Sequence, residues 1–278
     1  MCDEGRYGYK HLHDVGRLTQ PMVRDADGVA APTDWSNLTD RLDDVLRAAG
    51  SLAAILSPHL TVEEACLLAT YIRGLDSKAV LAVGPIPHEG DDEKFAGGFT
   101  IRAEKCPNRR GVEAIATALN GQLVEFEDFL VSLTDRDIQG VWVSGGYKTD
   151  WITNEQAEAL ASISWIVLQE MFLSPLSEAA AYRLGSPAFA EREGSYVNAN
   201  DQLQSFGWAI RPPAGVMRDG QLYSRLLGRS VMYRASEVLD EVSRSIPYFE
   251  AAVGEIPNVG VDLKGTFSAG AQRLGREV

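Results

Sequence analysis

The chain has 278 residues and a mass of 30.3 kDa, and its 45% hydrophobic and 23% charged residues are ordinary for a folded chain, which excludes a mainly disordered one. The formal net charge is −13, whereas a domain that grips phosphate backbones is normally basic, so nucleic acid is not an expected partner. Three cysteines do not make a disulfide scaffold, and no run approaches the ~20 apolar residues of a membrane span. We therefore expect a cytoplasmic protein, built as two domains or one large α/β domain.

Residues 1–34 are predicted to be irregular, because Pro21 and Pro32 interrupt a stretch that is rich in Gly, Arg, His and Tyr. Short apolar runs and helical patterns then alternate. Strands are predicted at residues 52–56, 79–83, 141–143 and 163–168, and helices at residues 35–49, 61–74, 111–119, 126–133, 155–161, 221–228 and 236–245.

Two of the predicted helices begin with capping-box spacing, in which a threonine is followed three residues later by Glu or Gln. The pairs are Thr61 with Glu64, and Thr153 with Gln156. Each pair predicts that a helix starts directly after the threonine.

Short apolar strands that alternate with helices predict an α/β fold, with a parallel sheet covered by helices on both faces. Ligands of such sheets bind at the carboxyl ends of the strands. Residues 84–98 are predicted to be a surface loop. Residues 174–213 are predicted to be irregular, with a turn and a short strand at residues 194–198.

Common catalytic and metal-binding motifs are absent from the sequence: there is no CxxC, GxSxG, HExxH, P-loop or GxGxxG. Cys66 is expected in the core and Cys106 on a surface loop. His11 and His13 have a spacing that allows metal ligation, but no third ligand is evident. Ser144-Gly145-Gly146 follows a predicted strand. It is either an ordinary tight turn, which the local pattern favours, or a loop that lets the backbone approach a phosphate.

Several longer segments carry a resemblance. They are Met1-Cys2-Asp3-Glu4-Gly5-Arg6-Tyr7-Gly8-Tyr9-Lys10 with Arg17-Leu18-Thr19-Gln20-Pro21, residues 175–204, and Ala209-Ile210-Arg211-Pro212-Pro213-Ala214-Gly215. In order and spacing they resemble the molybdopterin oxidoreductase family. The resemblance implies that residues 35–278 form the α/β body of that family, and that residues 1–34 are the end of an iron–sulfur module.

Within this family, the segment from Cys2 to Arg6 is similar to the large iron–sulfur subunit of NADH:quinone oxidoreductase, complex I. Molybdenum enzymes commonly have a lysine where this chain has Glu4. The resemblance implies that Cys2 is a metal ligand, the last of four thiolates of a [4Fe–4S] cluster, and that Glu4, Gly5 and Arg6 surround the cluster.

Two further positions match the cofactor-binding region of the family. Gly145 matches a glycine near the pterin guanosine diphosphate, and Asn198 lies in the second segment that would bind the pterin. However, Gly146 and Tyr147 replace the usual Glu-Asn pair. Molybdopterin is therefore not an expected cofactor of this chain.

The resemblance implies that the chain is part of the large subunit of a complex I-like NADH:quinone oxidoreductase. It would support electron transfer through iron–sulfur clusters, bound to other subunits of a respiratory NADH dehydrogenase-like complex, in the cytoplasm or peripheral at the inner membrane. The other three cysteines of the cluster do not precede Cys2, so we expect a fragment, an internally assigned start or a split gene. The alternatives are a fragment of a molybdenum or tungsten bis-pterin oxidoreductase, such as formate dehydrogenase, and a cofactor-free binding module.

Overall fold

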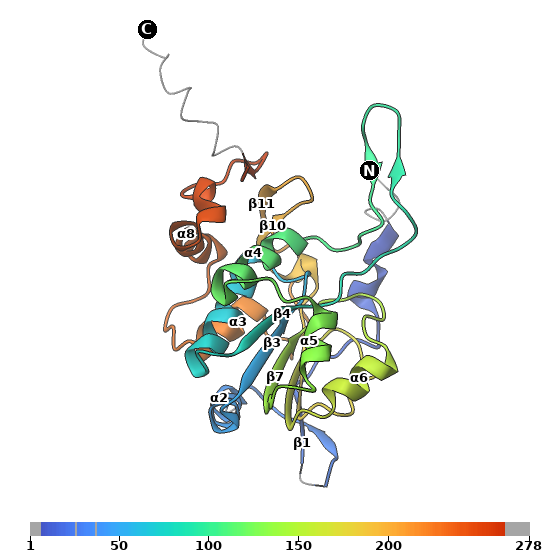
Figure 1. Cartoon of the computed structure of the whole chain (residues 1–278), viewed down its shortest axis with the longest axis vertical. Coiled ribbons are helices and arrows are strands. Elements are labelled where there is room, and N and C mark those ends of the chain that lie inside the picture. The colour runs from blue at the N-terminus through green and yellow to red at the C-terminus, as the bar shows by residue number, and fades with distance from the viewer. Residues whose placement is uncertain (1–6, 26, 37, 265–278) are drawn as a thin grey trace.

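The computed structural model of the chain describes residues 7–25, 27–36 and 38–264 (Figure 1). Its α-helices are α2 (Leu38–Ala49), α3 (Val62–Leu75), α4 (Arg109–Asn120), α5 (Phe126–Ser132), α6 (Asn154–Leu160), α7 (Asp219–Leu226) and α8 (Ala235–Ser245), and its 3-10 helices are η1 (Gly8–His13), η2 (Phe189–Glu191) and η3 (Pro247–Ala252). Its strands are β1 (Met22–Arg24), β2 (Ala30–Pro32), β3 (Leu52–Leu56), β4 (Val80–Val83), β5 (Glu93–Lys94), β6 (Thr100–Ile101), β7 (Gly140–Ser144), β8 (Trp165–Glu170), β9 (Tyr182–Gly185), β10 (Gly194–Val197), β11 (Gln202–Phe206) and β12 (Val261–Asp262).

The central sheet has seven strands in the order β2-β1-β9-β8-β7-β3-β4. From β9 to β4 every neighbouring pair is parallel, and β1 and β2 are added antiparallel at one edge. The chain forms β3, then β4 on one side of it, and then crosses back to place β7, β8 and β9 on the other side. This is the doubly wound order, and it puts a topological switch point between β3 and β7. The prediction of a mainly parallel α/β sheet is confirmed.

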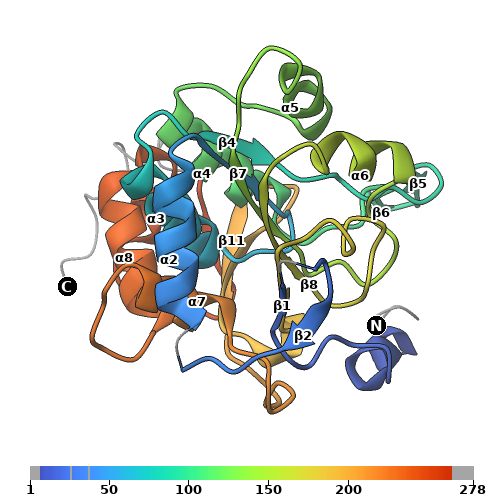
Figure 2. The same ribbon diagram turned by 90° about the horizontal axis from the view of Figure 1, so that it is seen from below.

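Helices cover both faces of this sheet, because alternate residues of the buried strands point to opposite sides. In β3, Leu52, Ala54 and Leu56 belong to one core cluster, whereas Ala53 and Ile55 belong to the other. The first cluster is packed under α2, α3, α4, α7 and α8, and the second under α5 and α6 (Figure 2).

Both predicted capping boxes form at the helix starts. The Thr61 side chain accepts from the backbone N–H of Glu64, and the Glu64 carboxylate accepts in return from the N–H of Thr61. Thr153 and Gln156 make the same reciprocal pair at α6. The two differ in environment, since Thr61 is fully buried and Thr153 is exposed.

Four strands lie in segments that the sequence predicts to be irregular. β1 and β2 fall within residues 1–34, and β9 and β11 fall within residues 174–213. Three to five residues with no alternation give no periodic signal, and these strands exist because neighbouring strands pair with their backbones. β9, for example, is paired on one side with β8 and on the other with β1.

The predicted surface loop at residues 84–98 is in part a hairpin. β5 and β6 pair antiparallel across a turn at Gly97 and Gly98, and both glycines have positive φ. Figure 1 shows this hairpin projecting from the body of the molecule, at the same end as η1. Among the described residues, no helix is both long and apolar enough to cross a membrane.

We expect Thr61→Ala to lower the free energy of unfolding by about 1–2 kcal/mol, and Thr153→Ala by about 1 kcal/mol or less. Both substitutions orphan a backbone N–H, but water can replace the hydroxyl only at the exposed Thr153. Urea unfolding of the two variants and the wild type measures the difference. Equal losses in the two variants would show that burial of the cap does not matter.

Candidate functional site

The largest cavity of the described residues, about 520 Å³, lies at the carboxyl ends of the parallel strands. His59 follows β3 in the chain, and Gly146 and Lys148 follow β7, so the cavity opens over the switch point between these two strands. Ser144 joins the two strand ends there, because its hydroxyl accepts from the N–H of Ser57 and donates to the carbonyl of Ile55, both at 2.9 Å. The volume of the cavity is in the range of small-molecule sites, and its position is where open α/β sheets bind ligands.

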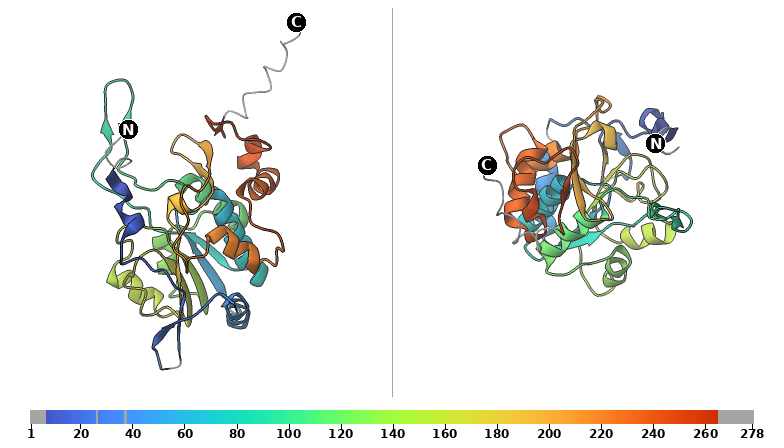
Figure 3. Two further views of the ribbon diagram at one scale, coloured as in Figure 1. Left: turned by 180° about the vertical axis from the view of Figure 1, so that it is seen from behind. Right: turned by 90° about the horizontal axis from the view of Figure 1, so that it is seen from above.

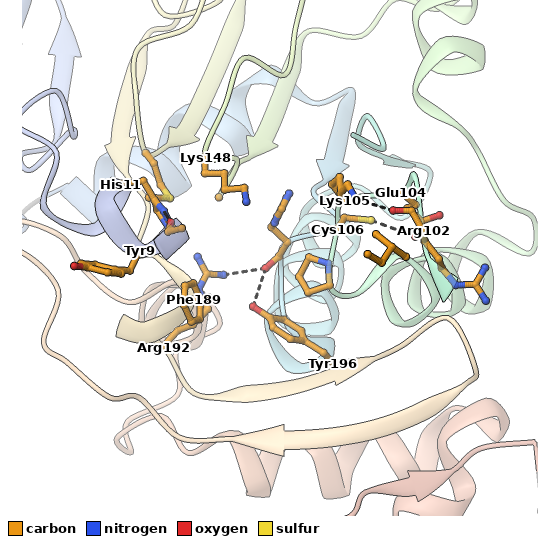
Figure 4. A pocket seen from close by; sticks show the side chains of 16 residues that line it. Tyr9, His11, Arg102, Glu104, Lys105, Cys106, Lys148, Phe189, Arg192 and Tyr196 are labelled. Carbon is orange, nitrogen blue, oxygen red and sulfur yellow. Dashed lines mark hydrogen bonds between the residues drawn. The ribbon is translucent and has the colours of Figure 1, made fainter. Parts of the chain in front are cut away.

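Segments that are distant in sequence form the walls of this cavity, which we call the switch-point pocket. Figure 4 shows Tyr9 and His11 of η1 with Phe189 of η2 on one side. The segment that follows the β5–β6 hairpin forms the other side. Figure 3 shows η1 and the hairpin rising at the same end of the molecule, which is how they come to flank the opening.

The pocket is positively charged, although the whole chain carries −13. Four cationic side chains line it, Arg102, Lys105, Lys148 and Arg192, against one carboxylate, Glu104. Tyrosine and phenylalanine rings add apolar surface. An anionic group with a flat apolar part is therefore the kind of ligand that the lining suits.

The floor of the pocket is a buried guanidinium. Arg192, with 2% of its side chain exposed, donates through Nη1 to the Glu64 carboxylate at 2.7 Å. Its Nη2 lies 3.2 Å from an oxygen of Asp219 and donates to the carbonyl of Pro187. Burial raises the pKa of Asp219 to about 8 against the lowering effect of Arg192, so Asp219 is largely protonated at neutral pH. The cluster then holds one cation and one anion.

The neighbouring residue in the chain makes a second buried ion pair. The Glu191 carboxylate accepts from both terminal nitrogens of Arg17, each at 2.7 Å, with 2% of each side chain exposed. Arg17 also donates to the carbonyl of Leu12 at 2.9 Å. The two adjacent residues thus bind η2 to the N-terminal segment on one side and to the start of α3 on the other.

The groups that could react in the pocket are held in unreactive forms at neutral pH. Burial, with Arg192 and Lys148 nearby, lowers the pKa of His59 to about 3, so its imidazole is neutral. Burial and Glu104 raise the pKa of the Cys106 thiol, which donates to the Glu104 carboxylate. A protonated thiol is a poor nucleophile.

Two of the predicted site residues, Gly145 and Asn198, lie near the pocket but do not line it. A Cβ on Gly145 would meet the Gln169 carbonyl oxygen at 2.3 Å, so this glycine lets the end of β7 run against β8. Its neighbour Gly146 does line the pocket, with φ +99° and its Cβ position 3.1 Å from His59. The Asn198 carboxamide oxygen accepts from two backbone N–H groups in the turn between β10 and β11.

The remaining predicted site residues, Cys2, Glu4, Gly5 and Arg6, lie outside the described residues. The described cysteines do not fit a cluster, because Cys66 lies on α3, beside Thr70, and Cys106 lies before α4. No group of three or more His, Cys, Asp or Glu in the described part of the chain is arranged to hold a metal. The cluster ligand therefore stays a prediction that rests on Cys2.

Sequence reasoning missed Glu191, Arg192 and the pocket cations. Only Arg17 and Glu64 stood out, one within the resembling segment and one in a capping box. The adjacent Glu191 and Arg192 have the pattern of a solvated pair of charges, because burial of a charge is decided by partners more than a hundred residues away.

No protein-family model matches the chain. Part of it is 32% identical over 74 residues to a subunit, the one designated G, of the NADH-quinone oxidoreductase of Streptomyces coelicolor, covering 26% of this chain and 9% of that protein. It is 26% identical over 115 residues to F420-dependent formate dehydrogenase 2 subunit alpha of Methanococcus maripaludis, covering 39% and 17%. It is 28% identical over 101 residues to NADPH-Fe(3+) oxidoreductase subunit alpha of Geobacter sulfurreducens, covering 35% and 12%.

The matched parts span less than a fifth of each of these relatives. By name, all three are subunits of oxidoreductases. The expected resemblance is thus supported in its coarse form, as partial similarity to this group of proteins.

The buried ion pair predicts a large loss of stability when one partner is removed. We expect Arg192→Met to lower the free energy of unfolding by roughly 3–5 kcal/mol, because Glu64 is left buried and unpaired. Glu64→Gln in the Arg192→Met background should restore part of this loss, since glutamine keeps the capping bond without the charge. Denaturant unfolding of the two singles and the double measures the coupling, and simple additivity would contradict the pairing.

A second stability prediction concerns Glu63, which is buried and accepts from the N–H of Ser195 at 2.8 Å. Burial raises its pKa from 4.5 to about 7, so the folded state keeps the proton that the unfolded state loses above pH 4.5. Wild-type stability therefore falls by roughly 3 kcal/mol through this group between pH 4.5 and pH 8.

Glu63→Gln removes this titration and keeps the hydrogen bond. Relative to the wild type, the variant should gain about 3 kcal/mol between pH 4.5 and pH 8. Urea unfolding at both pH values measures it. A stability difference that does not change with pH would show that Glu63 ionises normally in the folded protein.

Proposed function

We propose that the chain is part of the large iron–sulfur subunit of a complex I-like NADH:quinone oxidoreductase, where it supports electron transfer between iron–sulfur clusters and turns over no substrate of its own. The observation that carries this proposal is the 32% identity over 74 residues to the NADH-quinone oxidoreductase subunit of Streptomyces coelicolor. The other relatives are also named as subunits, which supports a role within a multi-subunit oxidoreductase.

The state of the pocket supports the absence of turnover. The His59 imidazole is neutral, and the Cys106 thiol is protonated and tied to Glu104. Catalytic groups are usually poised to exchange protons near the working pH. These two are held far from it, which suits a supporting domain. The electron carriers themselves would be clusters held by Cys2 and by cysteines of the other polypeptides.

A second candidate function is a part of a molybdenum or tungsten pterin enzyme, and one observation favours it. The switch-point pocket presents Arg102, Lys105 and Lys148 where an anionic ligand of an α/β sheet binds. A pterin cofactor carrying phosphate groups would meet these cations and the backbone at Gly146. That group would supply the redox chemistry, and the residues of this chain would bind and orient it.

The test is to isolate the complex from its native cell through a tag on this chain, to identify the associated polypeptides, and to measure iron, molybdenum, tungsten and released pterin. Iron without molybdenum or tungsten, together with NADH dehydrogenase-like subunits, is the expected result. Molybdenum or tungsten with pterin would replace the proposal by the second candidate. A chain that returns without metal or partners would contradict both and leave the cofactor-free module.

A matched pair of variants distinguishes the two candidates within the same experiment. Lys148→Glu places a negative charge in the pocket, and Arg136→Glu makes the same change on an exposed loop at the amino-terminal ends of the strands. If the pocket holds no anionic cofactor, the metal content of the two variants is equal. A selective loss of pterin and of molybdenum or tungsten from Lys148→Glu would favour the second candidate.

A further inference from the structure

A second concave surface lies beside η2, and it is separate from the switch-point pocket. Glu191 of η2 lines this surface, whereas Phe189 of η2 lines the pocket. Its volume is about 400 Å³. We call it the arginine–tryptophan groove, and it is formed by Trp208, Arg211, Pro212, Pro213, Ala214, Val216 and Arg218.

The loop that forms the groove is fixed at both ends. The backbone N–H groups of Ala209 and Ile210 both donate to the carbonyl of Ala190, at 2.7 and 3.0 Å. At the other end, the carbonyl of Gly215 accepts from the indole N–H of Trp35 at 2.9 Å. A Cβ on Gly215 would lie 2.0 Å from the Thr19 carbonyl oxygen, so the loop is pressed against the N-terminal segment. The groove is therefore already formed, which lowers the entropic cost of binding.

The charges of the groove are arranged for an anionic partner. Neither Arg211 nor Arg218 forms an ion pair with any residue that the structure describes; Arg218 lies over the Trp208 ring at 5.8 Å. Among the described residues that line the groove, the only carboxylate is Glu191, and both of its oxygens are already bound by Arg17. Two guanidinium groups thus face a groove in which no described acid neutralises them.

The walls are apolar and aromatic. Trp208 is 47% exposed, although a large aromatic side chain favours burial, and Pro212 and Pro213 continue the apolar surface beside it. Aromatic and proline walls between arginines suit an extended peptide: the arginines take carboxylates in a forked geometry and the indole takes an apolar side chain.

We infer that the arginine–tryptophan groove docks a short acidic peptide segment of a partner protein, with carboxylates on Arg211 and Arg218 and an apolar side chain on Trp208. The charge of the chain decides between this partner and a longer polyanion. A nucleic acid or an anionic membrane would extend beyond the groove over a surface with a net charge of −13, which repels it. A short segment meets only the local positive charge, because repulsion beyond about 10 Å is screened at physiological salt.

A random peptide library displayed on phage, selected against the purified chain, tests this inference. The expected outcome is enrichment of peptides that combine Asp or Glu with a large apolar residue. A fluorescein-labelled representative should bind with an affinity that falls with added salt, falls at least about tenfold in the double variant Arg211→Glu/Arg218→Glu, and falls clearly in Trp208→Ala.

The matched control is Arg41→Glu/Arg136→Glu, which changes the net charge equally at two exposed arginines outside the groove. It should bind the labelled peptide within about twofold of the wild type. Circular dichroism of all variants confirms that they are folded.

Several outcomes would overturn the inference. They are selection of neutral or basic peptides, no selection at all, equal binding by the groove variant, and equal weakening in the control. Displacement of the peptide by inorganic phosphate or by an RNA oligonucleotide at a similar concentration would identify a general anion site instead. None of these outcomes bears on the metal and pterin content that tests the proposed function.

Discussion

The buried guanidinium of Arg192 is the interaction on which the rest of the structure depends. A charge with 2% of its side chain exposed is tolerated only because Glu64, Asp219 and the Pro187 carbonyl surround it. Those partners come from the start of α3, the start of α7 and the segment after β9. One side chain thereby fixes how the helices on one face of the sheet meet the carboxyl ends of the strands.

The positions of the pocket and the groove follow from this constraint. Arg192 holds η2 down from one side, and the Arg17–Glu191 pair holds it from the other. Because η2 is fixed between them, Phe189 is presented to the switch-point pocket and Glu191 to the arginine–tryptophan groove. An acidic chain thus carries two positively lined concavities on either side of one short segment. The carboxylates nearest to them are largely occupied by internal arginines, which leaves cations facing outward.

Glycine at the sheet edge serves packing in this chain as much as any ligand. Gly145 allows contact between the backbones of β7 and β8, and Gly146 allows a positive φ beside His59. From the sequence, this turn could be ordinary or could serve a phosphate. Both glycines have a sufficient structural reason, and the cations around Gly146 are a separate observation that tertiary contacts bring to the same place.

The sequence by itself determined the repeating part of the fold. Apolar runs such as Leu52–Leu56 formed buried strands, and the capping boxes at Thr61 and Thr153 formed where their spacing predicted them, because both signals depend on neighbours a few residues away. Only the tertiary structure decided the short strands β1, β2 and β9, whose hydrogen bonds come from other strands, and the ion pairs of Arg17 and Arg192, whose partners lie 174 and 128 residues away. Charge, exposure and pKa at the pocket are set by what packs around each group, and local sequence carries no record of that.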